Sequence, residues 1–82
     1  MLQNIPNPAC DQSYILFYIP HKERVIFELV DLFGRTQMSR EIEAVSGENR
    51  IDLDLYQTPA GVYFYSVEYF GKKLTKRMIV IK

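Results

Sequence analysis

The chain has 82 residues with ten basic and ten acidic side chains, and 48% of its residues are hydrophobic. This length accommodates one small domain, and the neutral balance gives no electrostatic reason to expect nucleic acid or an anionic membrane surface as a partner. Apolar runs of only a few residues exclude a membrane-spanning helix, and the first residues lack the pattern of a secretory signal. The single cysteine, Cys10, excludes a disulfide within these residues.

The expected elements begin with a loop-like leader at residues 1–11, where Pro6 and Pro8 disfavour regular structure. Aromatic and β-branched residues then recur with a period of two, which is typical of strands. Pro20 ends the first strand because it cannot donate a ladder hydrogen bond. Strands are predicted at residues 14–19, 24–32, 37–45, 50–55, 62–70 and 74–81.

The clearest alternation lies in residues 50–55. The apolar residues Ile51, Leu53 and Leu55 are expected to face the core, and the two aspartates between them to face the solvent. This register predicts a strand with one buried and one solvated face.

Residues 37–45 would tolerate a helix, but their alternation and the strand before them favour an edge strand. Arg40 and Glu41 would hinder its pairing with another molecule. A turn is expected at Gly34, which can adopt a positive φ, and another turn ends at Gly61.

Together these elements predict an all-β fold, an immunoglobulin-like antiparallel β-sandwich of about seven short strands. A partly open barrel is the alternative. The predicted domains are a leader or linker at residues 1–12 and the sandwich at residues 13–82. Tyr63, two residues after Gly61 at the head of a strand, resembles the tyrosine corner of such sandwiches, although Tyr65 stands where a cysteine is usual.

The chain has no pattern of catalytic residues. His21 is the only histidine and is expected in a solvated loop. No Cys-His arrangement is implied for Cys10, and no serine has a histidine near it in sequence. Asp52 and Asp54 can supply calcium ligands, but a solvated strand face is the favoured interpretation. We therefore predict no catalytic, cofactor-binding or metal-binding residue, and no small-molecule substrate.

Four short motifs occur in order along the chain. They are Pro6-Asn7-Pro8-Ala9, followed by Asp11 and a strand; an apolar strand that runs into Asp31 and then Gly34-Arg35; Ile51-Asp52-Leu53 leading to Pro59-Ala60-Gly61-Val62-Tyr63-Phe64; and Lys76-Arg77-Met78-Ile79-Val80-Ile81-Lys82. Over residues 5–82, the motifs resemble the type A-like C-terminal sorting domains of the type IX (Por) secretion system of Bacteroidetes. Cys10 and Val30 depart from the residues usual in that family.

The resemblance implies a sorting signal, not an enzyme, at the end of a cargo protein that reaches the periplasm by its own signal. The outer-membrane translocon would recognise the domain. A sortase-like cysteine peptidase would then remove it, at or near residues 1–4, and often join the cargo to surface lipopolysaccharide. The implied location is the periplasm in transit, then the outer membrane, the cell surface or the medium.

The residues assigned to the sorting motif through this resemblance are Pro6, Asn7, Pro8, Gly34, Arg35, Gly61, Tyr63, Lys76, Arg77, Met78, Ile79, Val80, Ile81 and Lys82. Only Lys82 follows the last predicted strand, so we expect a partner that binds the end of the chain to bind a strand as well. Strand addition is a common mode of such recognition, and an exposed edge also allows a homodimer or a strand swap.

The alternative function is an immunoglobulin-like accessory module that binds carbohydrate or protein at the cell surface. Phe64 and Phe70 are its surface aromatic candidates, since the other face of their strand must fill the core.

Overall fold

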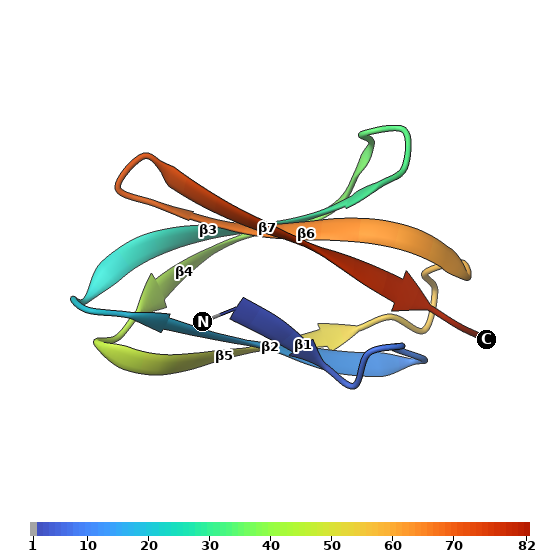
Figure 1. Cartoon of the computed structure of the whole chain (residues 1–82), viewed down its shortest axis with the longest axis horizontal. Coiled ribbons are helices and arrows are strands. Elements are labelled where there is room, and N and C mark those ends of the chain that lie inside the picture. Colours follow the sequence, from blue (N-terminus) through green and yellow to red (C-terminus); the bar gives the residue numbers. More distant parts are fainter. Residues whose placement is uncertain (1) are drawn as a thin grey trace.

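The computed structural model describes residues 2–82, which form two β-sheets packed face to face (Figure 1). The smaller sheet has the strand order β1-β2-β5 and the larger sheet the order β4-β3-β6-β7, with every neighbouring pair antiparallel. The strands are β1 (Leu2–Ile5), β2 (Gln12–Ile19), β3 (Glu23–Asp31), β4 (Thr36–Ala44), β5 (Gly47–Asp54), β6 (Gly61–Tyr69) and β7 (Lys72–Val80). The predicted sandwich is therefore confirmed, and the barrel alternative is wrong.

The core lies between the sheets and is built by alternate residues of the strands. Ile51, Leu53 and Leu55 are all buried, as their alternation predicts, while Asp52 and Asp54 are exposed on the opposite face. The other strands contribute in the same way, and the largest fully buried side chains include Tyr65, Phe17, Phe27, Ile15, Ile19, Leu29 and Met78.

The predicted edge strand is also confirmed. Among the described strands, β4 pairs only with β3, from Glu23↔Ala44 to Val30↔Thr36, and forms one edge of the larger sheet. Its glutamates Glu41 and Glu43 both form ion pairs with Arg24 of β3, at 2.9 and 3.1 Å. Charged side chains therefore line this edge, which disfavours pairing with another strand.

A tyrosine corner is present at the start of β6. The hydroxyl of Tyr63 donates a 2.6 Å hydrogen bond to the carbonyl of Pro59, four residues upstream, and the Tyr63 side chain is buried. This bond attaches the turn before Gly61 to the sandwich, as in immunoglobulin-like domains.

The prediction of a loop-like leader at residues 1–11 is wrong for Leu2–Ile5. These residues form β1, which pairs with β2 from Leu2↔Phe17 to Ile5↔Tyr14. Their strand propensity is weak, but the smaller sheet offers a free edge beside β2, and Leu2 is buried in the core. Tertiary contact has overridden the local preference.

Candidate recognition site

The segment after β1 lies beside the end of β7. We call residues 6–9 the strap. The N–H of Ala9 donates to the carbonyl of Ile79, and the N–H of Ile81 donates to the carbonyl of Ala9, both at 2.8 Å. These bonds form a parallel bridge between Ala9 and Val80, and the Ala9 side chain is fully buried. The strap therefore connects the smaller sheet to the last strand of the larger one (Figure 1).

Asn7 adds a side-chain contact to the same junction. Its Oδ1 accepts a hydrogen bond from the N–H of Ile79 at 3.5 Å, the upper limit for such a bond. Pro6 and Pro8 flank it and are exposed. Because the Asn7 contact is long, the strap is held chiefly by the backbone of Ala9.

Lys82 joins three segments that are distant in sequence. Its Nζ donates to Asp11 Oδ1 at 2.9 Å, to the carbonyl of Leu55 at 2.7 Å and to the carbonyl of Tyr56 at 3.2 Å. An ammonium group has three donors, so all of them are used. The Lys82 side chain is only 28% exposed. It therefore acts as a structural connection between the strap region and the turn after β5.

The turn between β3 and β4 is organised by Asp31. Its Oδ1 accepts hydrogen bonds from the N–H groups of Phe33 and Arg35, both at 2.9 Å, while its Oδ2 accepts from Arg35 Nε at 2.7 Å and from Gln37 Nε2 at 3.2 Å. Gly34 has φ +80°, a left-handed conformation that glycine adopts without strain. The Asp31 carboxylate therefore accepts four hydrogen bonds within this turn, and the Arg35 side chain lies at the surface.

This network lowers the pKa of the Asp31 carboxyl. Partial burial by itself raises the pKa, because it disfavours the charged form. The hydrogen bonds from the Arg35 backbone and guanidinium and from the Phe33 backbone favour the charged form and outweigh burial. The pKa of Asp31 therefore lies below its ordinary value.

The Asp31 turn and the Tyr63 corner face each other across a hollow of about 250 Å³ at the same end of the sandwich as the strap. Its lining comes from the two turns: Asp31, Leu32, Phe33, Arg35, Gln37, Pro59, Ala60, Gly61, Val62 and Tyr63. The strap, Lys82 and the two turns together form what we call the motif end. Figure 1 shows it on the side of the C label.

The structure brings most of the predicted motif residues to the motif end, but not all of them. Lys76 and Arg77 are exposed in the middle of β7, where they pair across the sheet with Tyr65 and Phe64. Met78 and Val80 are buried and belong to the core. The members at the motif end are Pro6, Asn7, Pro8, Gly34, Arg35, Gly61, Tyr63, Ile79, Ile81 and Lys82.

Three residues that organise the motif end stand in the quoted sequence motifs but were not assigned to the sorting motif. They are Ala9, Asp11 and Asp31, each of which bonds to a motif residue or to its turn. The role of Asp31 could have been expected, because an aspartate just before a glycine turn typically bonds to the backbone beyond it. The partners of Ala9 and Asp11 lie about seventy positions away, at Ile79, Ile81 and Lys82, and no local signal reveals them.

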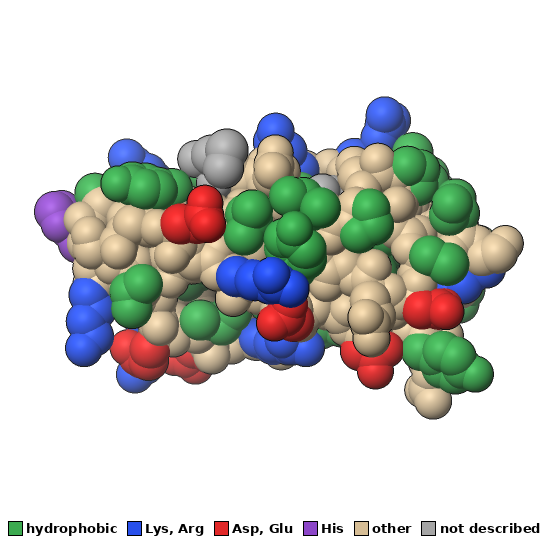
Figure 2. Space-filling model, turned by 90° about the horizontal axis from the view of Figure 1, so that it is seen from below, with side chains coloured by type: hydrophobic (Ala, Val, Ile, Leu, Met, Phe, Trp, Pro, Cys, Tyr) green, Lys and Arg blue, Asp and Glu red, His purple; other side chains and the backbone are tan. Residues whose placement is uncertain are grey.

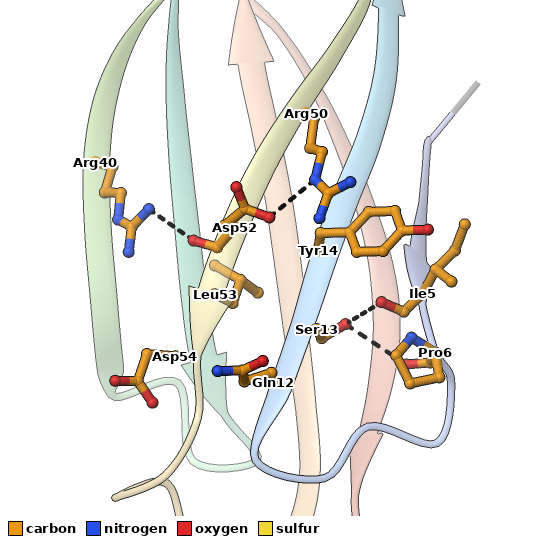
Figure 3. A pocket seen from close by; sticks show the side chains of 10 residues that line it. All are labelled: Ile5, Pro6, Gln12, Ser13, Tyr14, Arg40, Arg50, Asp52, Leu53 and Asp54. Atoms are coloured by element: carbon orange, nitrogen blue, oxygen red, sulfur yellow. Dashed lines mark hydrogen bonds and ion pairs between the residues drawn. The ribbon is translucent and has the colours of Figure 1, made fainter.

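Another hollow, with a volume of about 640 Å³, lies on the outer face of the smaller sheet (Figure 3). Arg50 covers the Tyr14 ring at 3.9 Å from its centroid and pairs with Asp52 at 2.9 Å. Figure 2 shows apolar, basic and acidic side chains next to one another on this face. The one aromatic ring that lines the hollow is thus already occupied by a guanidinium of the same chain.

The other candidate residues from the sequence do not form a binding site in this structure. Cys10 and His21 are exposed, and residues 2–82 contain no group of three His, Cys, Asp or Glu side chains that could hold a metal ion. The hydroxyl of Ser13 donates to the carbonyl of Ile5 at 3.1 Å, which attaches β1 to β2 (Figure 3).

The two surface aromatic candidates lie far apart. Phe64 is half-buried, and Phe70 is exposed six residues further along the chain, a distance of roughly 20 Å in an extended strand. No single ligand ring could stack on both.

The fold and the motif end define a small immunoglobulin-like β-sandwich in which remote sequence motifs build one surface. The family model of secretion system C-terminal sorting domains matches residues 4–82, and the chain belongs to this family. The family consists of type IX sorting signals and is not an enzyme family. Comparison with proteins of curated function gives no significant match.

Membership confirms the resemblance found in the sequence. It implies recognition by the type IX secretion machinery and export across the outer membrane to the cell surface or the medium. It gives no support to the alternative of an accessory binding module. Among residues 2–82 there is no helix long and apolar enough to cross a membrane.

Proposed function

We propose that this chain is the sorting signal of a cargo protein that passes through the periplasm and is recognised there by the outer-membrane type IX translocon. After transport, a sortase-like cysteine peptidase removes the domain and attaches the cargo to the cell surface. The family match supports the sorting role, and the geometry of the motif end supports the mode of recognition.

The observation that carries this proposal is the meeting of four sequence motifs in one folded surface. The strap bonds to Ile79 and Ile81, Lys82 bonds to the turn after β5, and the Gly34-Arg35 turn faces Gly61 and Tyr63. A receptor that binds the motif end therefore recognises a folded domain and not a linear peptide. Such a signal is presented only when folding has brought the segments together.

The structure also bears on where the peptidase acts. β1 begins at Leu2, which is buried and paired with Phe17. A cut within Leu2–Ile5 would require β1 to leave its sheet, whereas a cut before Leu2 leaves the sandwich intact. We therefore propose that the peptidase cuts before Leu2, which agrees with the expectation of a cut before the domain or in its leader.

The test is a fusion of residues 1–82 behind a periplasmic reporter in a host with type IX secretion. We expect the reporter at the cell surface or in the medium. Retention of the reporter in the periplasm, with the domain folded, would contradict the proposal.

Two variants separate recognition from folding. Arg35→Gln changes an arginine whose side chain is 72% exposed at the motif end, and Arg50→Gln changes a similarly exposed arginine on the outer face of the smaller sheet. We expect export to fall for Arg35→Gln alone, with both variants folded.

A third variant tests whether export depends on folding. Leu53→Ala removes a buried side chain and should lower the free energy of unfolding by about 2–4 kcal/mol, and its export shows whether loss of stability stops transport.

A further inference from the structure

Within residues 2–82, hydrogen-bond partners occupy the outer edge of β7 only at its C-terminal end. The strap binds both backbone groups of Ile79 and the N–H of Ile81. Alternate residues of a strand direct their backbone groups to the same edge, so those of Lys73, Thr75 and Arg77 point the same way as those of Ile79. Within residues 2–82, no backbone hydrogen bond joins these three residues to a partner on that side. This part of the edge is an open template for another strand.

The two long sides of the sandwich differ. On the side of β4 and β5, the chain crosses between the sheets, and Arg40 Nη1 donates to the carbonyl of Asp52 at 2.9 Å, which links β4 to β5 (Figure 3). On the side of β1 and β7, a groove of about 390 Å³ lies between these two strands, in the part of β7 that the strap does not reach. Leu2, Gln3, Leu74, Thr75 and Lys76 line this groove.

The open edge is strongly cationic. β7 carries Lys72, Lys73, Lys76 and Arg77 and no acidic residue, although the whole chain is neutral. Lys73 lies 3.9 Å from Glu28, a long ion pair. In the described part of the chain, no carboxylate pairs with Lys72, Lys76 or Arg77. An opposite charge on an added strand would meet cations that have no partner of their own.

This charge argues against a second copy of the chain as the added strand. Two β7 strands side by side would place cations opposite one another, which destabilises a sheet. The acidic side chains of the other edge, Glu41 and Glu43, are already paired with Arg24. The complementary strand must therefore come from another protein.

We propose that an extended acidic segment of a partner protein adds to the edge of β7 at residues 72–77. Its backbone pairs with Lys73, Thr75 and Arg77. Its carboxylates lie on the outer face of β7 beside Lys73 and Arg77, and an apolar side chain on the opposite face enters the groove beside Leu74. This inference rests on the proposed function for the nature of the partner, a component of the secretion machinery. It names the part of the domain that such a component binds, separate from the motif end.

The test mixes residues 1–82 with a capped ten-residue peptide of alternating glutamate and valine, and binding is measured by NMR. We expect binding that slows hydrogen exchange at the N–H groups of Thr75 and Arg77. The same peptide with alternate amides methylated keeps its charge but loses its strand edge, and should bind at least about tenfold more weakly. Equal binding of the methylated peptide, or of heparin in its place at the same residues, would show attraction by charge alone and overturn the proposal.

Two pairs of variants complete the test. Thr75→Pro removes one outward N–H at a position where an edge strand tolerates proline, while Thr75→Ala keeps it. We expect the proline variant to lose binding at least about tenfold and the alanine variant to change little. Lys73→Gln with Arg77→Gln should weaken binding, because both side chains share the face of the peptide carboxylates, and Lys22→Gln with Arg50→Gln should not.

Unchanged binding by Thr75→Pro, or dimerisation of the free chain through β7, would each overturn the proposal. The export assay is independent of these measurements. Export without peptide binding would reject strand addition and leave the sorting function intact. Peptide binding without export would reject the sorting function and leave strand addition intact.

Discussion

At the scale of single residues, the motif end depends on two charged side chains that bond mainly to backbone atoms. The Lys82 ammonium binds two carbonyls and the Asp11 carboxylate, and the Asp31 carboxylate binds two backbone N–H groups and the side chains of Arg35 and Gln37. Charged groups form stronger hydrogen bonds than neutral ones, so each can hold a turn that has little core of its own.

Lys82→Gln should lower the free energy of unfolding by roughly 1–2 kcal/mol, because it removes charge-assisted hydrogen bonds from a half-buried site. Lys76→Gln is the matched control and should stay within about 0.5 kcal/mol of the wild type, since Lys76 is exposed. Urea denaturation of the two variants measures the difference. Equal midpoints for both would mean that the Lys82 contacts do not persist in solution.

Asp31→Asn should lower the melting temperature at pH 7, and the difference from the wild type should shrink in acid. The pKa of Asp31 is lower in the folded state than the ordinary value of about 3.9. Its charge therefore stabilises the fold above that value, and the contribution is lost as the pH falls through the lowered pKa. Melting curves between about pH 7 and pH 2 test this expectation.

The control for that series is Asp52→Asn, at a side chain that is 75% exposed. It should show a smaller difference from the wild type at pH 7, because exposed ion pairs contribute little. If the difference in melting temperature between Asp31→Asn and the wild type stayed constant across the acid range, the charge of the Asp31 carboxylate would be unimportant for stability.

At the scale of elements, the hairpin between β6 and β7 turns at Phe70 and Gly71. Both have positive φ, 50° and 72°. Two-residue hairpins prefer this geometry because it matches the twist of the strands, but they place asparagine or glycine at the first position. A phenylalanine is strained there. Phe70 is 65% exposed and has one edge-on contact with the ring of Tyr69.

Phe70→Asn should therefore raise the free energy of unfolding by about 1 kcal/mol, since asparagine tolerates the left-handed conformation. Phe70→Ala removes the same ring but keeps a side chain that is strained at this φ, and it should not stabilise. Denaturant unfolding of the two variants gives the answer. Equal stabilisation by both would attribute the effect to the ring and not to the backbone.

At the scale of the whole molecule, the proposed function depends on a folded surface and not on single reactive side chains. Cys10→Ser and His21→Ala should leave both the unfolding midpoint and export of a fused reporter nearly unchanged, because each side chain is exposed and lacks the partners of a catalytic group. Loss of export by either variant, with the fold intact, would reveal a role that the structure does not explain.

Local pattern was sufficient for most of the sandwich. Ile51, Leu53 and Leu55 could be assigned to the core because a strand exposes and buries its residues in strict alternation. The turn at Gly34 and the corner at Tyr63 could be expected for a similar reason, since each depends on residues within about four positions. The motif residues were also visible in the sequence, as a linear series.

Only the tertiary structure decided what those residues do. β1 is a strand because β2 has a free edge beside it, and its own sequence favours a loop. Lys82 and Lys76 look alike in the sequence, yet Lys82 bonds to Asp11, 71 positions away, and Lys76 remains exposed. Contacts between residues so far apart depend on how two sheets pack, and no local periodicity contains that information.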